Sequence, residues 1–223
     1  MTVFGMEFVL LSGLTDDERR DLLATARRRR FGRREVVFHE GDPGDSVHLV
    51  VSGHLAVRVT TALGDVATLR VVGPGQFVGE LALLDGAARN ATVVAIEGAE
   101  TMAVRRVRFD ELRDRSPHAQ TALSSALGTE VRRLAAALVE AMYLPVEERF
   151  WRRVLEMVGV FGAERPIPLT QEELAQLAGA ARPTANRLLR DAQADGIVAL
   201  RRGALEVLDI AAVRRRAGLR AGD

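Results

Sequence analysis

Two residues of opposite charge flank a short apolar segment at residues 79–93, which read GELALLDGAARNATV. Glu80 can accept hydrogen bonds from hydroxyl groups, and Arg89, nine residues later, can bind a phosphate through charge-assisted hydrogen bonds. The spacing therefore fits a ligand with both groups, such as a cyclic nucleotide, while a Glu–Arg ion pair that only holds the segment is the alternative. The candidate binding residues, which include neighbouring backbone groups, are Gly79, Glu80, Leu81, Arg89, Asn90 and Ala91.

A β structure is expected to position this segment. Between residues 35 and 107, short apolar runs such as VHLVV, HLAVRV and ATVVAI alternate with turn signals such as GDPGD, LGD and GPG. This spacing predicts a compact antiparallel sandwich or barrel of about eight strands. The preceding run RRRRFGRR (residues 27–34) is expected to be a solvated charge patch, and a helix capped by Ser12 or Thr15 is expected before it.

A long helix is predicted between Phe109 and Tyr143, with Pro117 at an early helical position. Its apolar side chains are spaced alternately by four and three residues, which makes a seam of the kind found in coiled coils. The seam could pack on the β structure, or on the same helix of a second copy. We favour a homodimer formed through residues 123–142. The seam residues are Leu127, Val131, Leu134, Leu138 and Ala141.

Residues 171–190, QEELAQLAGAARPTANRLLR, match the template of a helix-turn-helix. Thr170 and Glu173 form a capping-box pattern before the first helix, and Gly179 stands at the turn, where a left-handed backbone favours glycine. Small or apolar residues occupy the positions where the two helices would touch, namely Leu174, Ala175, Ala178, Ala180, Ala185 and Leu188. The alternative is a helical hairpin with surface arginines.

The second helix of this motif carries polar residues near its N-terminal end, which such motifs place in the major groove of DNA. An arginine can bind O6 and N7 of guanine with two hydrogen bonds. The residues expected to face the bases are Arg182, Thr184, Asn186 and Arg187, and those expected to bind phosphates are Thr170, Gln171, Arg190, Arg201 and Arg202. A two-stranded wing with a turn at Gly203 is predicted after them, and a helix with core residues Phe150, Trp151, Leu155 and Val158 before them.

Composition narrows the classes of protein. The 223 residues are 48% apolar and contain no cysteine, which excludes disulfides and thiolate metal sites. All 31 basic residues are arginine, and the net charge is +1. The sequence has no apolar run long enough to span a membrane and no secretory leader, so we expect a cytoplasmic protein without a membrane partner.

Residues 79–93 are similar to the phosphate-binding cassette of cyclic-nucleotide-binding domains, GELALxxGxPRAATV, and the upstream EGDPGDSVHLVVSG resembles the turn and strand of the same domain. Together with the helix-turn-helix, the chain resembles the cyclic-AMP receptor protein (CRP/FNR) family of bacterial regulators. The resemblance implies an α+β protein with a β-roll (jelly-roll) sensor at residues 1–116, a dimerisation helix at 117–144 and a winged helix-turn-helix at 145–223.

The resemblance also assigns roles. It implies that Glu80 holds the ribose 2′-hydroxyl of a cyclic nucleotide, that Arg89 holds its phosphate, and that the dimer binds double-stranded DNA and RNA polymerase. Leu134 and Ala135 stand where the cyclic-AMP-binding branch has Thr and Ser, and Asn90 replaces a small residue. The resemblance makes cyclic AMP the first candidate ligand. Because of these departures, another cyclic nucleotide, another small molecule or no ligand stay as alternatives.

The second helix of the helix-turn-helix also departs from the pattern of the family. Pro183 replaces a glutamate that accepts from cytosine in the cyclic-AMP-binding branch, so the preferred DNA site is expected to differ at that base pair. A small β roll is also compatible with a cupin-like metal enzyme. That fold would need clustered ligands, whereas the four histidines include no H-x-H pair, so neither catalytic residues nor a metal site are expected.

Overall fold

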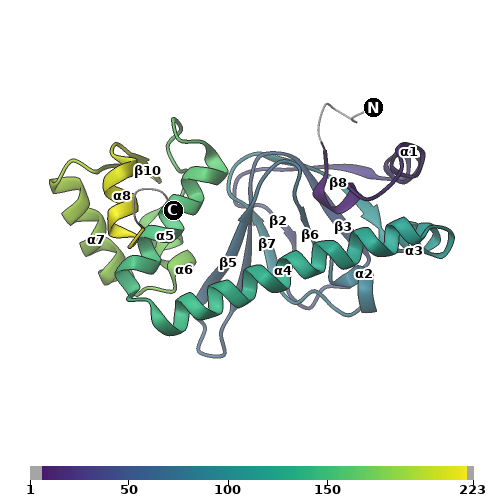
Figure 1. Ribbon diagram of the computed structural model, residues 1–223, viewed down its shortest axis with the longest axis horizontal. Helices are drawn as coiled ribbons and strands as arrows, with labels where there is room; N and C mark the ends of the chain where they lie inside the picture. The colour runs from purple at the N-terminus through teal and green to yellow at the C-terminus, as the bar shows by residue number, and fades with distance from the viewer. Residues whose placement is uncertain (1–6, 220–223) are drawn as a thin grey trace. The chain divides into compact units, whose positions relative to one another are not determined.

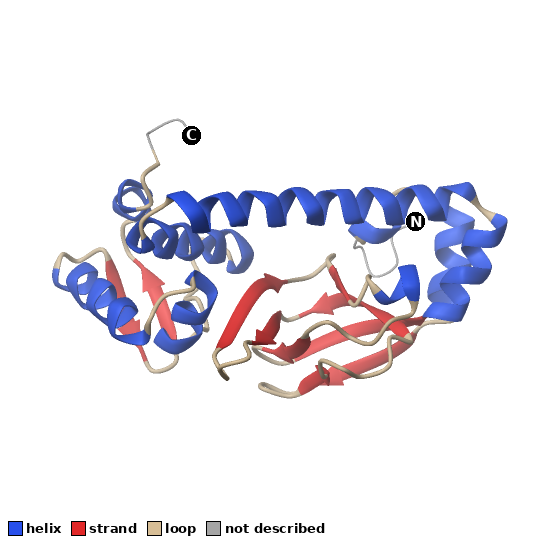
Figure 2. Ribbon diagram, turned by 90° about the horizontal axis from the view of Figure 1, so that it is seen from below, coloured by secondary structure: helices blue, strands red, loops and turns tan. Residues whose placement is uncertain are grey.

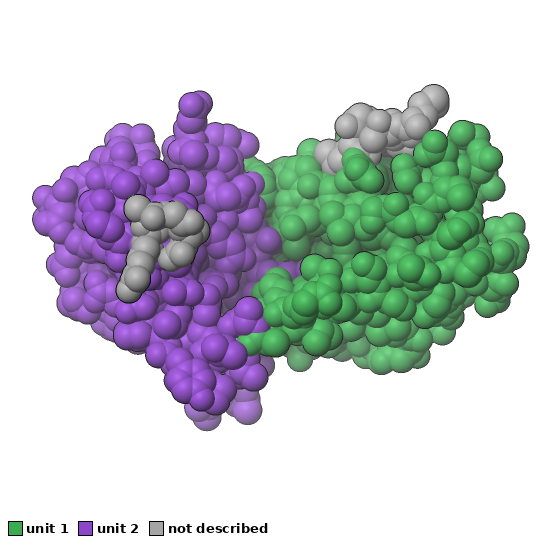
Figure 3. All heavy atoms as spheres, viewed as in Figure 1, with its two compact units in different colours: residues 1–59, 72–135 green, residues 60–71, 136–223 purple. Residues whose placement is uncertain are grey.

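The computed structural model describes residues 7–219; residues 1–6, where the expected sensor begins, and residues 220–223, where the expected DNA-binding domain ends, lie outside the described residues. The chain divides into two compact units, residues 1–59 with 72–135 and residues 60–71 with 136–223 (Figure 3). The three-part division at residues 116 and 144 stays a prediction.

Antiparallel strands form the N-terminal half of the chain (Figure 1). Two four-stranded sheets have the orders β1-β8-β3-β6 and β2-β7-β4-β5, which confirms the predicted β roll. In chain order, the elements are η2 (Val9–Leu11), α1 (Asp16–Ala24), β1 (Arg27–Phe31), β2 (Val36–Phe38), β3 (Ser46–Ser52), β4 (Leu55–Thr60), β5 (Val66–Val72), β6 (Phe77–Val78), α2 (Ala82–Asp85), β7 (Thr92–Ala95) and β8 (Ala99–Arg105).

The side chains of β3 contribute to two separate cores, because successive residues of a strand point to opposite faces of a sheet. Val50 packs with Leu55 and Val93, which belong to the other sheet, and so fills the interior of the roll. Val47 and Leu49 point the other way and pack against residues from the surrounding helices. Strand β3 is therefore buried on both faces.

The arginine run at residues 27–30 is part of the sheet. The prediction placed the first strand after it, but these residues form β1, which pairs antiparallel with β8. Arg28 and Arg30 both donate to Glu100 of β8, the latter from Nε to Oε2 at 3.0 Å. Only Phe31 of this strand is buried. The run is solvated, as expected, and it forms a charged edge strand, which discourages pairing with other chains.

The helical stretch after β8 is broken once. α3 (Arg106–Arg115) ends at Ser116, whose backbone is extended, and α4 (Pro117–Tyr143) then begins at the expected proline. The first turns of α4 pack on the β roll through small side chains, among them Ala119, Ala122 and Ala126. Figure 2 shows this part of α4 running along the sheets.

The predicted seam is exposed in the single chain. Leu127 is partly buried against the β roll. Val131, Leu134 and Leu138 are 65%, 45% and 61% exposed, and Met142 is 64% exposed. These residues are the apolar face of α4 that residues 7–219 leave uncovered.

The second compact unit, called the C-terminal unit below, has its own core, which is formed by the elements that follow α4. Its elements are α5 (Val146–Phe161), α6 (Gln171–Ala178), α7 (Arg182–Ala194), β9 (Val198–Arg201), β10 (Ala204–Val207) and α8 (Ile210–Arg216). Phe150 and Trp151 are fully buried as predicted, and the Arg216 guanidinium carbon lies 5.5 Å from the centroid of the Trp151 ring. Leu155, predicted to be in this core, is only partly buried, whereas Val154 is fully buried. Phe150, Trp151 and Val158 are thus buried as predicted, and Val154 takes the place of Leu155.

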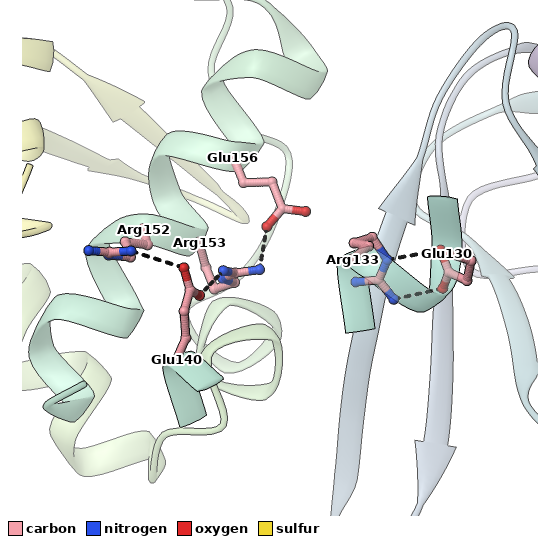
Figure 4. A network of polar contacts seen from close by, with 6 residues as sticks. All are labelled: Glu130, Arg133, Glu140, Arg152, Arg153 and Glu156. Atoms are coloured by element: carbon pink, nitrogen blue, oxygen red, sulfur yellow. Dashed lines mark hydrogen bonds and ion pairs between the residues drawn. The ribbon is translucent and has the colours of Figure 1, made fainter. Parts of the chain in front are cut away.

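A carboxylate fastens the last turns of α4 to α5 (Figure 4). Glu140 accepts from Nη1 of Arg152 at 3.1 Å and, with its other oxygen, from Arg153. Arg153 also donates to Glu156 at 2.7 Å. These contacts lie on both sides of the Leu144–Pro145 bend, where α4 ends and α5 begins.

Candidate functional site

The predicted ligand segment surrounds the short helix α2. Gly79 follows β6, and its φ of +86° is a conformation that favours glycine. A Cβ atom at this position would lie 2.5 Å from Nη1 of Arg89. The glycine therefore lets the arginine side chain lie directly against the backbone at the start of the segment.

Arg89 is buried, with only 3% of its side chain exposed. Its Nη1 donates to the carbonyl oxygen of Gly79 and its Nη2 to Oγ of Ser46, both at 3.2 Å. The guanidinium carbon lies 4.2 Å from the centroid of the Phe38 ring, which is within the range of a cation–π interaction. Oδ1 of Asp45 lies 3.6 Å from Nη2.

One donor of this guanidinium has no acceptor. Within the described residues, Nε of Arg89 is buried and lacks a hydrogen-bond partner. Burial lowers the pKa of Arg89 below its usual value, while the carboxylates of Asp45, Asp42 and Glu80 act in the opposite direction. A phosphate oxygen could supply the missing acceptor, since charge-assisted hydrogen bonds to arginine are strong.

A second loop holds the backbone of Arg89 in place. The N–H of Arg89 donates to the carbonyl oxygen of Asp42, and its carbonyl oxygen accepts from the N–H of Gly41, both at 2.8 Å. This loop is the GDPGD turn of the sequence, and it leads into Ser46. The contacts of Phe38, Asp45 and Ser46 with Arg89 were missed by the sequence analysis, although the turn motif was recognised.

The other predicted ligand residues differ in exposure. Glu80 is buried, and its carbonyl oxygen accepts from the N–H of Leu83 at 3.0 Å in the first turn of α2. Leu81 is 40% exposed, Asn90 is exposed and Ala91 is buried.

A buried histidine lies close to the same ring. His48 on β3 packs against Phe38, with 5.8 Å between the ring centroids, and its Nδ1 lies 3.0 Å from Oγ1 of Thr101. Burial, with the positive charges of Arg89 and Arg29, lowers the pKa of His48 to about 4. His48 is therefore neutral at physiological pH.

Two of the remaining histidines pair with carboxylates. Nδ1 of His54 lies 2.6 Å from Glu97, and Nδ1 of His118 lies 3.4 Å from Glu18. His39 lies in the loop after β2. Within residues 7–219, no three His, Cys, Asp or Glu side chains are grouped so that they could hold a metal ion.

The C-terminal motif has the predicted geometry. Thr170 and Glu173 form both hydrogen bonds of the capping box, and Gly179 has a φ of +59° between α6 and α7. Apart from Ala180, which is partly buried, the predicted contact residues between the helices are buried. The wing is present as β9 and β10, which pair antiparallel around Gly203.

The predicted DNA contacts differ in exposure. Arg182, Arg187, Arg190, Arg201 and Arg202 are exposed, whereas Thr170, Gln171, Thr184 and Asn186 are partly buried. The side-chain oxygen of Asn186 is buried and has no hydrogen-bond partner within the described residues.

Three of the exposed arginines are paired with carboxylates. Nε of Arg182 lies 3.3 Å from Glu172, and Nη1 of Arg187 lies 3.4 Å from Asp191. Arg201 donates from Nε and Nη2 to Glu206 across the wing, at 3.1 and 3.0 Å.

Comparisons with known proteins match both halves of the chain. Residues 28–116 match the family "Cyclic nucleotide-binding domain", and residues 132–216 match the "Crp-like helix-turn-helix domain". The Cyclic AMP receptor protein of Thermus thermophilus is 33% identical over 204 residues, which cover 91% of this chain and 93% of that protein. The CRP-like cAMP-activated global transcriptional regulator of Mycobacterium tuberculosis is 30% identical over 193 residues, covering 84% and 86% of the two chains.

Solved structures agree with the fold. The catabolite activator protein of Thermus thermophilus has 30% identity and a TM-score of 0.55, covering 94% of this chain and 98% of that one. The c-di-GMP-responsive regulator CLP of Xanthomonas campestris, with 23% identity and a TM-score of 0.74, covers 86% and 99% and is similar in fold.

A cyclic-nucleotide-binding domain joined to a winged helix-turn-helix defines a class of DNA-binding transcriptional regulators. The chain belongs to the cyclic AMP receptor protein (CRP/FNR) family of such regulators. The family consists of transcription regulators and not enzymes, so the cupin-like metal enzyme considered from the sequence is wrong. No helix within residues 7–219 is both long enough and apolar enough to span a membrane.

Proposed function

We propose that this regulator acts as a homodimer whose binding to specific DNA sites is controlled by a cyclic nucleotide held by Glu80 and Arg89. The observation that supports the ligand site best is the buried Arg89, whose Nε has no acceptor within the described residues. Glu80 would accept a hydrogen bond from the ribose 2′-hydroxyl, and the neighbouring backbone of Leu81, Asn90 and Ala91 would contribute further polar groups.

Cyclic AMP is the first candidate for this ligand, since the relatives from Thermus thermophilus and Mycobacterium tuberculosis are named for it. The part of the site that would contact the base lacks the hydroxyl side chains with which the cyclic-AMP-binding branch contacts adenine. No Ser or Thr stands between Val131 and Ala141, so this stretch of α4 has no hydroxyl side chain to offer to adenine. Another cyclic nucleotide is the alternative that this feature favours.

Titration calorimetry tests the ligand proposal. We expect the wild-type protein to bind cyclic AMP or cyclic GMP, Arg89→Ala to lose this binding, and Arg33→Ala, which removes an exposed arginine from the same domain, to bind as the wild type does. Binding of both nucleotides to the wild type weaker than about 1 mM would refute the sensor proposal.

The dimer proposal is supported by the exposed apolar face of α4. In a dimer, this face would pack against its twin, as coiled-coil seams do. Leu138→Arg places a charge in the seam and is expected to give monomers in sedimentation equilibrium, whereas Leu63→Arg changes a leucine that is 92% exposed in the β4–β5 turn and should leave the dimer intact. A monomeric wild-type protein would contradict the proposal.

Ligand binding would act on DNA binding through α4 and the bend at Pro145. A ligand that contacts both the β roll and α4 would favour one packing of the two α4 helices. That packing would place the two α7 helices about 34 Å apart, as successive major grooves require. Coupling energies of this kind are typically about 1–3 kcal/mol.

In this mechanism, Arg182 and Arg187 read bases, while Arg190, Arg202 and the start of α6 bind phosphates. Mobility shifts on genome fragments, with and without nucleotide, test sensing and DNA binding together. If the protein shifts the DNA equally with and without nucleotide, it is a DNA-binding regulator, but the proposed control by a cyclic nucleotide is wrong. Contact with RNA polymerase and a cytoplasmic location are further parts of the proposal, by analogy with the family.

A further inference from the structure

The carboxylates that pair with Arg182, Arg187 and Arg201 contact different nitrogens of the guanidinium group. Glu206 accepts from Nε and Nη2 of Arg201, and Asp191 lies against the terminal Nη1 of Arg187. Glu172 instead lies against Nε of Arg182, at 3.3 Å from Oε2. In this last pair the recorded contact is made by Nε and not by a terminal amino group.

That difference matters for reading a base. An arginine has five N–H donors in a fixed planar arrangement, and guanine presents O6 and N7 as two adjacent acceptors in the major groove. A carboxylate on Nε fixes the plane of the guanidinium and leaves the two terminal groups to meet those acceptors. The same carboxylate on a terminal group would compete with the base.

Local structure explains why the two side chains meet. Glu172 is the second residue of α6, whose start is fixed by the capping box of Thr170. Arg182 is the first residue of α7, and the left-handed Gly179 sets the turn between the helices. Both side chains line a hollow of about 270 Å³ at the start of α6, which Arg201 of the wing also borders.

The pair contributes little to the stability of the free protein. Arg182 is 70% exposed and Glu172 is 46% exposed, and exposed ion pairs are weakened by solvent and salt. On DNA, water is displaced from the groove and the contact strengthens. The pair also presents no net charge to phosphates, which lowers the part of the affinity that does not depend on sequence.

We propose that Glu172 is a positioning residue that orients Arg182 toward guanine and restrains non-specific DNA binding. This inference rests on the proposed function, because it requires that Arg182 reads a base. It adds a specificity determinant on α6 to those of the recognition helix α7. Pro183, the residue after Arg182, has no side-chain acceptor of its own.

The test is a double-mutant cycle on base preference. The wild-type protein, Glu172→Gln, Arg182→Ala and the double variant are each bound to a duplex pool with randomised half-sites, and the bound fractions are sequenced. We expect Glu172→Gln to reduce the preference for guanine at one position by roughly tenfold. In the Arg182→Ala background, the same change should leave base preferences as they are.

Binding to poly(dI-dC) at several salt concentrations measures the effect of the Glu172 charge on non-specific binding, apart from its effect on the orientation of Arg182. Glu172→Gln should bind this polymer more tightly, with a salt dependence steeper by about 0.9 in log–log slope. Asp195→Asn is the matched control, since it removes a carboxylate at the other end of α7, about 20 Å along the helix, and should leave base preferences unchanged.

Three results would overturn the inference. Tighter binding by Glu172→Gln with unchanged base preferences would show that the Glu172 carboxylate acts only by repelling phosphates. Weaker binding to every duplex, with a lower melting temperature, would show that Glu172 has only a structural role. If Arg182→Ala leaves base preferences unchanged, the assignment of Arg182 in the proposed function fails, and the role of Glu172 fails with it.

Discussion

The buried His48 makes the stability of the β roll depend on pH. In the folded protein its pKa is about 4, whereas the ordinary value, which applies to the unfolded chain, is 6.5. At pH 5 the unfolded chain therefore binds a proton at this position and the folded protein does not. Because the unfolded state binds more protons, stability falls as the pH drops below 6.5, and the loss is complete below about pH 4.

The size of the effect follows from the two values. Between pH 7 and pH 5, the difference in proton binding removes about 2 kcal/mol from the free energy of unfolding. His48→Gln should abolish this contribution, since glutamine does not titrate but can still form a hydrogen bond with Thr101. Urea unfolding followed by far-UV circular dichroism at pH 7 and pH 5 should show the wild type losing about 2 kcal/mol more than the variant.

An NMR titration of the histidine Cε1 protons tests the pKa directly. One of the four histidine signals should remain unchanged from pH 8 to about pH 5, and this signal should be absent from His48→Gln. Equal pH dependence of unfolding in the two proteins, or titration of the His48 signal near pH 6.5, would refute the assignment of a neutral His48.

Three other substitutions test the site and its supports. Gly79→Ala should lose ligand affinity in calorimetry, because its Cβ displaces the Arg89 side chain, whereas Gly64→Ala, with a similar φ of +89° but open space around it, should cost only about 1–2 kcal/mol of backbone strain. Arg187→Ala should weaken specific binding by about 1–3 kcal/mol and relax one base position, and an unchanged DNA footprint would contradict this. Glu140→Gln should destabilise the C-terminal unit in thermal unfolding by about 1–2 kcal/mol, because its carboxylate holds Arg152 and Arg153 of the next helix. Glu130→Gln, which removes the bond to Arg133 within α4, is the comparison.

The helix-turn-helix was predictable because its signals are local. The capping box of Thr170 and the left-handed Gly179 involve residues a few positions apart, so the sequence alone specifies where α6 begins and ends. The role of Arg187 in reading DNA was predicted in the same way and remains a prediction.

Long-range contacts were not predictable from spacing. Ser46 lies 43 positions from Arg89, and only the pairing of strands brings them together. The strand character of β1 was missed because four arginines show no alternation of apolar and polar residues, and its partner Glu100 lies about 70 residues away. The choice of Leu155 in place of Val154 has another cause, since these adjacent apolar residues lie four and three positions after Trp151 and both spacings fit one helix face.

The single tryptophan of the chain, Trp151, is enclosed in the C-terminal unit, and the single tyrosine, Tyr143, lies in that unit as well. Intrinsic emission excited at 295 nm therefore reports on the DNA-binding half and leaves the β roll spectroscopically silent. Denaturation curves recorded by fluorescence and by circular dichroism should diverge wherever the two units melt independently, so the protein carries its own optical label for telling the two transitions apart.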